Sequence, residues 1–248
     1  MPCEWAEEYR PGGFHPVTLG DIFKDGRYRI IRKLGYGSYS TVWLVRDALQ
    51  SRYAALKIMM AKDSDVKTEL DILGHLSARA EGDADSYHLT TLFDTFMCQG
   101  PNGSHRCLVF EPMGSTVASM AERLPENIPQ RYGVPARYPI SMARRILLHT
   151  LRGLAFLHKN GITHGDLQPG NILFSIDNIH SISEDDLKQN ESHIIPLRRV
   201  DGKVDRWAPK TLYLEEPLFT HAQSGSGSMQ FGRRSLRLSS FRLGLRTE

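Results

Sequence analysis

Short runs of β-branched and aromatic residues, separated by turn-like stretches, mark the first half of the chain. Such runs, bounded by turn residues, are typical of antiparallel strands. A turn tripeptide, Pro101-Asn102-Gly103, separates the last two runs. Five segments are therefore predicted to form an antiparallel sheet, namely residues 28–34, 41–46, 52–59, 88–97 and 106–111.

Two other segments repeat apolar residues every three or four positions, which is the spacing of one helix face. The first runs through residues 66–76 and follows Asp63-Ser64, a candidate N-cap. The second covers residues 140–159 and ends at Asn160-Gly161, a typical C-terminal stop. The pattern therefore predicts one helix within the strand-rich half and one longer helix after it.

Both ends of the chain lack this regularity. Residues 10–20 are rich in glycine and proline and predict an extended arm, so the ordered core is expected to begin near Arg27. Residues 181–190 are acidic and polar, and residues 224–228 are a Ser/Gly run. We find no internal repeat.

Composition excludes several classes of protein. With 40% hydrophobic and 24% charged residues the chain is expected to be globular. The last 25 residues carry a net charge of +4, and the rest sums to −1, so direct nucleic-acid binding is not expected. Three cysteines without metal-ligand spacing predict a reducing compartment. The absence of an apolar run of about 18 residues, and of a leader, argues against membrane insertion and secretion.

A glycine pair lies between two predicted strands, in Leu34-Gly35-Tyr36-Gly37-Ser38. Backbone N–H groups in such a hairpin can approach phosphates closely, although Gly35 and Gly37 could equally make a tight turn. Lys57 follows in a predicted strand and could be a snorkelling surface lysine. Glu69, on the first predicted helix, could be one charge on a solvated face.

The segment 162–173 places His164, Asp166 and Asn171 between apolar anchors. Together with the glycine hairpin, Lys57 and Glu69 in the same order, it resembles the eukaryotic protein-kinase motifs. Within that family, Leu-Gly-Tyr-Gly-Ser-Tyr-Ser-Thr-Val-Trp-Leu, Gly-Gly-Phe-His-Pro-Val and Val-Phe-Glu-Pro-Met-Gly are most similar to the SR-protein kinases and their fungal relatives. The resemblance covers roughly residues 10–175.

The resemblance implies an α+β, protein-kinase-like fold, with a five-stranded antiparallel N-lobe that carries one helix and an incomplete helical C-lobe. Four segments follow from it. They are an N-terminal arm (1–26), the kinase N-lobe (27–111), a partial C-lobe with the catalytic loop (112–180), and an insert-like segment with a basic, disordered tail (181–248).

The resemblance also implies roles for individual residues, with ATP and Mg2+ as cofactors. Lys57 contacts the α and β phosphates and is held by Glu69, and Asp166 accepts the proton of the substrate hydroxyl. Asn171 binds magnesium. The other implied nucleotide contacts are Gly35 and Gly37 over the phosphates, Leu34, Val42 and Ala55 above the adenine, Leu173 below it, and the backbone of Glu111 and Met113 at its edge.

The catalytic loop departs from the family pattern at two positions. Gly165 replaces the arginine that pairs with an activation-loop phosphate in many kinases, so switching by that route is not expected. Gln168 stands where serine/threonine kinases have a lysine near the transferring phosphate. Loss of a charge-assisted hydrogen bond of about 1.5–3 kcal/mol corresponds to roughly 10- to 150-fold in rate.

The largest departure lies beyond Asn171, because the chain contains no Asp-Phe-Gly. Residues 238–244 occupy about the place of that motif after a family-type insert, but they offer serine where a carboxylate is needed. No Ala-Pro-Glu is present either, since Ala208-Pro209 is followed by Lys210. We therefore interpret the chain as a kinase truncated after the catalytic loop, with residues 224–248 arising from an altered reading frame or an unspliced intron.

Three functions remain open from the sequence. The first is a non-specific serine/threonine protein kinase that transfers the ATP γ-phosphoryl group to protein serine or threonine, with arginine/serine-rich partners, in the cytoplasm or nucleus. The second is a truncated pseudokinase that binds nucleotide or partners without catalysis. The third is a small-molecule phosphotransferase, because His-Gly-Asp-Leu-x-Pro-Gly-Asn also resembles the loop of aminoglycoside and choline kinases. The oligomeric state is not specified by the sequence.

Overall fold

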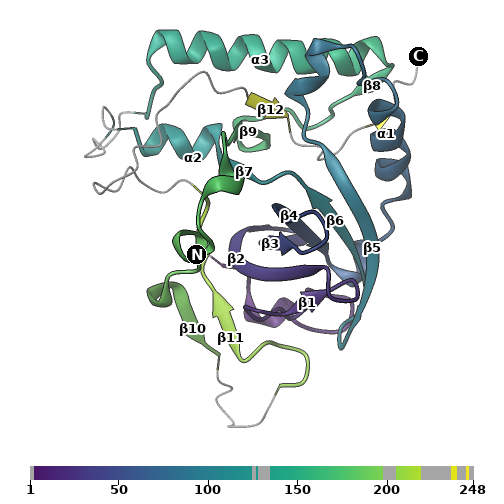
Figure 1. The fold of residues 1–248 in the computed structure, drawn as a ribbon, viewed down its shortest axis with the longest axis vertical. Coiled ribbons are helices and arrows are strands. Elements are labelled where there is room, and N and C mark those ends of the chain that lie inside the picture. The colour runs from purple at the N-terminus through teal and green to yellow at the C-terminus, as the bar shows by residue number, and fades with distance from the viewer. Residues whose placement is uncertain are drawn as a thin grey trace. The chain divides into compact units, whose positions relative to one another are not determined.

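The structure, a computed structural model, describes residues 3–124, 127, 135–197, 205–218, 236–238 and 244–245 (Figure 1). It divides into two compact units, which are described separately. The first unit comprises Met1–Val66, Leu92–Pro112 and Asn178–Leu218. The second comprises Lys67–Thr91, Met113–Asp177 and Phe219–Glu248.

The first unit is built on a six-stranded antiparallel sheet of order β1-β2-β3-β4-β6-β5. The five predicted strands are all present, and a two-residue strand, β1, is added at the edge. The strands are β1 (Ile22–Phe23), β2 (Tyr28–Gly37), β3 (Ser40–Asp47), β4 (Arg52–Met59), β5 (Leu92–Gly100) and β6 (Gly103–Phe110).

The start of the fourth predicted strand is wrong. β5 begins at Leu92, whereas His88 ends a 3-10 helix, Ala84–His88. The side chain of Asp83 accepts a hydrogen bond from the backbone N–H of Asp85 and so starts this turn. Such local side-chain bonds offer the backbone an alternative to strand pairing.

The N-terminal arm belongs to the folded core, which contradicts the expectation that order begins near Arg27. Tyr9, Phe14 and Val17 are 5%, 4% and 1% exposed, and Val17 packs in the same cluster as Tyr28 and Trp43. The predicted extended arm is interrupted by turns at residues 11–13 and 19–20, where glycine and proline are concentrated. Glycine and proline gave no indication that the few apolar side chains between them would fill the sheet's core.

Backbone hydrogen bonds fix the arm to the β5–β6 hairpin. Gly12 N–H donates to the carbonyl of Asn102 over 2.7 Å, and the Asn102 side-chain amide donates to the carbonyl of Phe14 over 2.6 Å. Ala61 N–H donates to the carbonyl of Gly13 over 3.1 Å. The arm therefore has partners from two distant segments, which local sequence cannot reveal.

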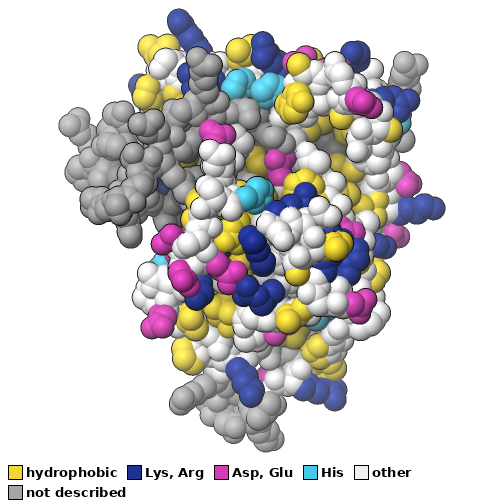
Figure 2. Space-filling view, in the orientation of Figure 1, with side chains coloured by type: hydrophobic (Ala, Val, Ile, Leu, Met, Phe, Trp, Pro, Cys, Tyr) yellow, Lys and Arg dark blue, Asp and Glu magenta, His cyan; other side chains and the backbone are white. Residues whose placement is uncertain are grey.

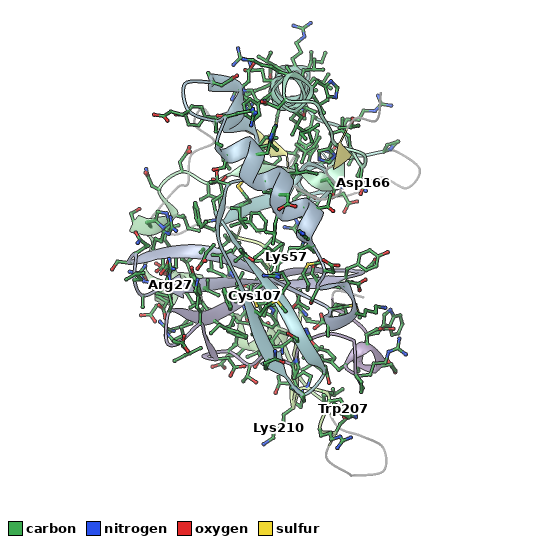
Figure 3. All side chains as sticks on the ribbon, turned by 90° about the vertical axis from the view of Figure 1, so that its right-hand side faces the viewer. Arg27, Lys57, Cys107, Asp166, Trp207 and Lys210 are labelled. Atoms are coloured by element: carbon green, nitrogen blue, oxygen red, sulfur yellow. The ribbon has the colours of Figure 1, made fainter. Side chains whose placement is uncertain are left out.

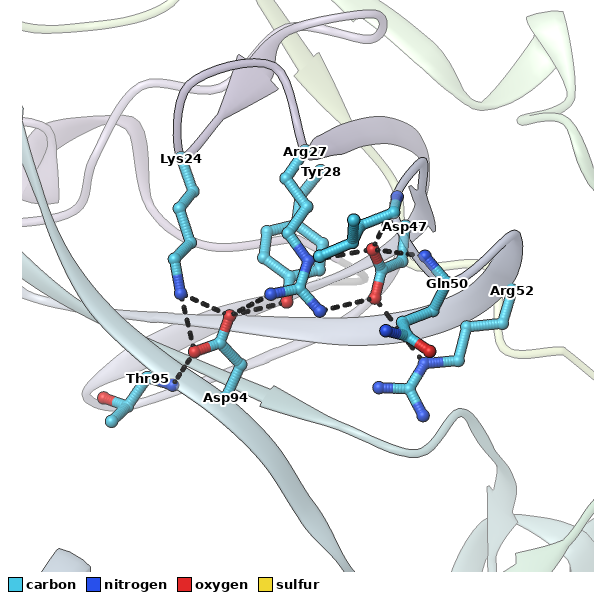
Figure 4. A network of polar contacts seen from close by, with 9 residues as sticks. Lys24, Arg27, Tyr28, Asp47, Gln50, Arg52, Asp94 and Thr95 are labelled. Atoms are coloured by element: carbon cyan, nitrogen blue, oxygen red, sulfur yellow. Dashed lines mark hydrogen bonds and ion pairs between the residues drawn. The ribbon is translucent and has the colours of Figure 1, made fainter.

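Asp47 and Asp94 hold the strand ends of the sheet through a charged network (Figure 4). Arg27 binds both carboxylates, over 2.9 Å to Asp47 and 3.1 Å to Asp94. Lys24 and Tyr28 also donate to Asp94. Burial alone would raise the pKa of Asp94, but the hydrogen bonds from Lys24 and Tyr28 outweigh it and lower the pKa below its ordinary value.

Residues 181–197 and 205–218, which fall in the predicted insert-like segment, belong to the first unit. They contain α4 (Glu184–Leu187), β10 (Ile194–Pro196) and β11 (Thr211–Tyr213). Glu184 forms an ion pair with Arg29 of β2 at 2.7 Å. The ring of Tyr213 meets the ring of Trp43 edge-on in the core.

The second unit combines helices with two small sheets. Its elements are α1 (Lys67–Ser77), β7 (Met113–Thr116), α2 (Val117–Glu122), α3 (Ile140–Lys159), β8 (Ile162–Thr163), β9 (Ile172–Ser175), β12 (Leu236–Leu238) and β13 (Gly244–Leu245). The bounds predicted for the long helix are confirmed by α3. Asn160 caps it, and Gly161 follows with a φ of 73°, a left-handed conformation that favours glycine.

The predicted N-cap of the first helix is wrong. α1 begins at Lys67, and Ser64 instead closes a 3-10 turn in the first unit. The Ser64 hydroxyl donates to the carbonyl of Met60 over 2.9 Å and accepts from Arg106 N–H over 2.9 Å. The Ser64 hydroxyl, predicted to cap the helix, therefore bonds to the backbone of Arg106 on β6 instead.

Two short pieces of the predicted disordered tail are strands. β12 pairs antiparallel with β9, with Leu236 opposite Phe174, and β13 pairs antiparallel with β8, with Gly244 opposite Thr163. The remainder of the tail, including the Ser/Gly run, lies outside the described residues. Strand pairing supplied by β8 and β9 explains these two pieces, because the tail itself has no strand periodicity.

One face of α3 is apolar and exposed. Phe156 and Leu157 are buried in the core of the second unit, at 2% and 0% exposure. Ile140, Leu147 and Leu151 are 72%, 62% and 61% exposed.

Within the described part of the chain, no helix has the length and hydropathy needed to cross a bilayer.

Candidate functional site

The predicted phosphate loop is the β2–β3 hairpin. Gly35 pairs with Val42 and Gly37 with Ser40, and the register shifts between Lys33 and Gly35. Neither glycine has a positive φ, and a Cβ added at Gly37 would contact nothing within 4 Å. A tight turn therefore does not explain the glycines. Their effect is to leave the hairpin backbone open to approach.

Lys57 lies in the middle of the same sheet (Figure 3). It is paired with Val42 on β3 and with Leu108 on β6, and it is only 3% exposed. Ala55, two residues earlier, is also buried and faces Leu44 and Phe110. Burial excludes the alternative of a snorkelling surface lysine.

Glu69 lies in the first turn of α1, in the second unit. It is half-buried, and its Oε1 atom is buried and accepts no hydrogen bond from the described residues. An ionised carboxylate oxygen without a donor is costly in such a position. This site is therefore suited to receive a cationic or hydrogen-bonding partner.

Asp166 is held by two amide side chains of its own loop. Gln168 Nε2 donates to Asp166 Oδ1 over 3.1 Å. Asn171 Nδ2 donates to Asp166 Oδ2 over 3.0 Å and to the Asp166 carbonyl over 2.8 Å. Two amide donors, one on each carboxylate oxygen, fix the side chain in one orientation.

The backbone before Asp166 is sharply turned. Asp166 N–H donates to the carbonyl of His164 over 2.9 Å, and His164 is 2% exposed. Gly165 has a φ of 71°, which a residue with a Cβ adopts only with strain. This turn therefore favours the glycine found where many kinases have arginine.

The remaining predicted nucleotide contacts are distributed over both units. Leu34 and Val42 are half-buried in the first unit, and Glu111 directly follows β6. Met113 is the first residue of β7. Leu173 lies on β9 and pairs with Thr116 at the end of β7. The structure thus gathers Leu34, Gly35, Gly37, Val42, Ala55, Lys57 and Glu111 in the first unit, and Glu69, Met113, Asp166, Asn171 and Leu173 in the second.

The described residues do not provide the ligands that the magnesium expected of a kinase would need. Magnesium is usually bound through one or two carboxylates together with substrate phosphates. Asn171 is the predicted ligand, but it can offer only a neutral amide oxygen. The described residues contain no group of three or more His, Cys, Asp or Glu side chains arranged to hold a metal.

Residues 238–244 stand about where the sequence analysis expected the missing Asp-Phe-Gly motif, and strand pairing holds both ends of this segment. Leu238, the last residue of β12, is opposite Ile172, and Gly244, the first of β13, is opposite Thr163. The linking residues 239–243 read Ser-Ser-Phe-Arg-Leu and lie outside the described residues. No carboxylate is present in this link, so we derive no catalytic step through a metal.

Glu215 is a residue that the sequence did not single out. A Cβ on Gly35 would lie 4.0 Å from Glu215 Oε2, so this carboxylate reaches the glycine hairpin. The backbone N–H of Glu216 donates to the carbonyl of Lys33 over 2.9 Å, which holds the segment against β2. No sequence spacing links residue 215 with residue 35, and only the packing of 178–218 brings them together.

Charged residues of both signs are interspersed on the face drawn in Figure 2.

Comparison with known proteins finds similarity to protein kinases. Residues 28–187 match the protein kinase domain family. Protein kinase dsk1 of Schizosaccharomyces pombe is 38% identical over 178 residues, covering 70% of this chain and 31% of that protein. The serine/threonine-protein kinase SKY1 of Saccharomyces cerevisiae is 33% identical, covering 72% and 24%. SRSF protein kinase 3 of Homo sapiens is 33% identical, covering 70% and 30%.

A solved structure shares the fold. The kinase domain named PF14_0431 superimposes with a TM-score of 0.57 at 20% identity, covering 95% of this chain and 56% of that chain. The chain spans between 17% and 38% of the length of the curated relatives given for comparison. The matched region contains the glycine hairpin, Lys57, Glu69 and the catalytic loop.

Proposed function

This chain belongs to the protein kinase domain family, and we propose that it carries the nucleotide-binding and catalytic-loop parts of a serine/threonine kinase of the SR-protein-kinase type. The reaction is transfer of the ATP γ-phosphoryl group to a serine or threonine hydroxyl. The observation that carries this proposal is the catalytic loop, in which Asn171 and Gln168 fix the carboxylate of Asp166.

Nucleotide binding is the first role of the proposed site. The open backbone of Gly35 and Gly37 would cover the phosphates, and the buried ammonium of Lys57 would contact the α and β phosphates. Ala55, Val42 and Leu34 of the first unit would pack on the adenine, and the backbone of Glu111 would hydrogen-bond its edge.

Asp166 would act as the general base. Its carboxylate would accept the proton of the substrate hydroxyl as that oxygen attacks the γ-phosphorus. Holding the base in one orientation reduces the entropy that the transition state must lose. Asn171 and Gln168 are positioning residues in this scheme, because each donates to one oxygen of that carboxylate.

The substrate class follows from the relatives. One of them is named as an SRSF protein kinase, and we extend that class of substrate, an arginine/serine-rich protein, to this chain. Gly165 supports a kinase that needs no activation-loop phosphate, because it leaves no arginine at that position to pair with one.

The 248-residue chain by itself favours nucleotide binding without transfer, which is our second candidate function. Asn171 is its only predicted side-chain metal ligand and is neutral, and Gln168 places no positive charge near the γ-phosphate. These deficits act on one transition state, in which positioning and electrostatics supply nearly all the catalysis. The losses of reaction rate that they cause should therefore reinforce one another.

Thermal unfolding in the presence of ATP tests the binding step. A ligand that binds only the folded state raises the midpoint, by about 2.7 kcal/mol of stability at a hundred times its dissociation constant. We expect ATP at millimolar concentration to raise the midpoint and Lys57→Met to abolish most of this shift. No shift for the unmodified chain would refute nucleotide binding.

Transfer of labelled γ-phosphate to an arginine/serine-repeat peptide separates the two candidates. We expect the 248-residue chain to give no more product than its Asp166→Ala variant. Turnover clearly above that variant would show that this chain is itself a kinase and would remove the second candidate.

A further inference from the structure

Two of the three cysteines are neighbours on adjacent strands of the first unit's sheet. Cys98 lies on β5 and Cys107, labelled in Figure 3, lies on β6. The register pairs Phe96 with Cys107 and Cys98 with His105, so the two cysteines are diagonal neighbours. The Cys107 thiol donates a hydrogen bond to Cys98 Sγ over 3.5 Å. Both side chains therefore project from the same face of the sheet.

The two sulfurs differ in access. Cys98 is partly exposed and lines a surface cavity of about 640 Å³, together with His15, Phe23 and Lys24. Cys107 is 0% exposed and packs in the core of the sheet. A small reagent in solvent can therefore reach Cys98, whereas Cys107 is closed to solvent.

Their electrostatic environments differ in the same sense. The hydrogen bond from Cys107 lowers the pKa of Cys98, although burial opposes this effect. That hydrogen bond, together with burial, raises the pKa of Cys107. Since the thiolate is the nucleophilic form of cysteine, Cys98 is the group prepared to react first.

From this geometry we propose that Cys98 and Cys107 form a peroxide-reactive pair, in which Cys98 is the site of oxidation and Cys107 resolves it as an intramolecular disulfide. Three geometric observations are sufficient to support the proposal. They are the strand register, the 3.5 Å contact between the sulfurs and the cavity that Cys98 lines. The proposal does not depend on the proposed kinase activity.

The chemistry needs hydrogen peroxide as the oxidant. The Cys98 thiolate attacks one peroxide oxygen, an S–O bond forms, the O–O bond breaks, and the departing hydroxide takes up a proton to give water. The Cys107 sulfur then attacks Cys98 Sγ as its thiol proton leaves. An S–S bond forms, the S–O bond breaks, and a second water departs. Two thiols are oxidised and one peroxide is reduced to two waters.

An S–S bond is about 2.05 Å long, so the sulfurs must approach by about 1.5 Å. Diagonal neighbours on adjacent strands lie about 7–8 Å apart, so closing the bond also needs a shift of the strand backbone. The disulfide would join β5 and β6 close to their hairpin, where Gly100 pairs with Gly103.

Peptide mapping of the full 248-residue chain tests the proposal. After treatment with hydrogen peroxide, the protein is denatured in iodoacetamide and digested with trypsin. Cleavage after Arg106 places Cys98 in peptide 80–106 and Cys107 in peptide 107–123. We expect these two peptides to be found joined, to separate on treatment with dithiothreitol, and to form from monomeric protein.

Cys3 is an internal control, because burial and Glu4 raise its pKa and it has no cysteine partner among the described residues. We expect Cys98 to lose its reactivity toward iodoacetamide faster than Cys3 during peroxide treatment, because the thiolate is the reacting form. If Cys3 is oxidised while Cys98 remains reduced and is still alkylated by iodoacetamide, the proposal is wrong. A disulfide between two chains would also overturn it.

Two variants assign the roles. Cys98→Ser removes the reactive sulfur from a partly exposed position, and Cys107 should then stay fully reduced. Cys107→Ala should leave Cys98 as a sulfenic acid that dimedone traps. Oxidation of Cys107 in the Cys98→Ser protein, or over-oxidation of Cys98 without a joined peptide in the unmodified protein, would refute the pairing.

Discussion

A buried ion pair connects the N-terminal arm with the glycine hairpin. Lys33, the residue before Leu34 on β2, is 0% exposed, and its ammonium binds the carboxylate of Glu4, which is 3% exposed. Lys33 also donates to the carbonyl of Tyr213 over 3.0 Å, and the Tyr9 hydroxyl donates to Glu4. The pair therefore fixes three segments that lie far apart in the sequence.

Lys33→Met removes the cation and leaves the Glu4 carboxylate buried with Tyr9 as its donor. Breaking a buried pair in this way costs about 3–5 kcal/mol, because the remaining charge is uncompensated. At about 2–4 °C per kcal/mol for a chain of this size, the unfolding midpoint should fall by about 6–20 °C. Adding Glu4→Gln removes the stranded charge, so the double variant should recover part of the loss.

Urea and thermal unfolding of the single and double variants measure this coupling. Lys62→Met is the matched control, because it makes the same change at an exposed lysine of the first unit. If Lys33→Met loses no more stability than Lys62→Met, the arm is not anchored by this pair. Additive losses in the double variant would equally refute the reasoning, since contacting partners must show an interaction energy.

Three further predictions concern acid stability, the nucleotide site and association. Burial and the nearby His105 lower the pKa of His15 to about 4, so between pH 6.5 and 4 the unfolded chain binds a proton that the folded chain does not. The free energy of unfolding should therefore fall on acidification through this window, by about 3 kcal/mol at most, and His15→Gln should flatten the slope in urea titrations at stepped pH. Glu215→Gln removes a negative charge beside Gly35 and should tighten ATP binding by about two- to tenfold in calorimetric titration, whereas Glu81→Gln, at an exposed position, should leave it unchanged. Leu147→Lys with Leu151→Lys should reduce self-association measured by light scattering, because it breaks the exposed apolar face of α3, and unchanged association would show that this face is not used.

The regular elements could be predicted because their signals are local. β3 and β4 are paired over their whole lengths, and their alternating apolar residues fill one core. α3 has both a helical period and a terminal Asn160-Gly161, and its bounds match the prediction. Period and capping depend on residues a few positions apart, so the sequence alone contains them.

Elements that depend on distant partners could not be predicted. β12 and β13 exist because β9 and β8 offer free pairing edges to residues more than 60 positions away. The arm is ordered because Asn102 and the core around Tyr28 receive it. Ser64 does not cap α1, because its hydroxyl accepts a hydrogen bond from Arg106 N–H on β6, 42 positions away in the sequence.

The candidate site divides in the same way. The sequence by itself determined which residue types stand in which order, from Gly35 through Lys57 to Asp166 and Asn171, because the chemistry of phosphoryl transfer requires those groups at those spacings. It also determined that Asp166 and Asn171 could meet, since they are five residues apart in one loop.

Only the tertiary structure decided how these groups are surrounded. It buried Lys57 in the sheet, set Glu215 beside Gly35, joined Lys33 to Glu4 and placed Cys98 against Cys107. Each of these contacts joins separate strands or segments whose spacing in the sequence follows no helical or strand period. Such contacts arise when several elements pack against one core, and the packing fixes which distant side chains share a face.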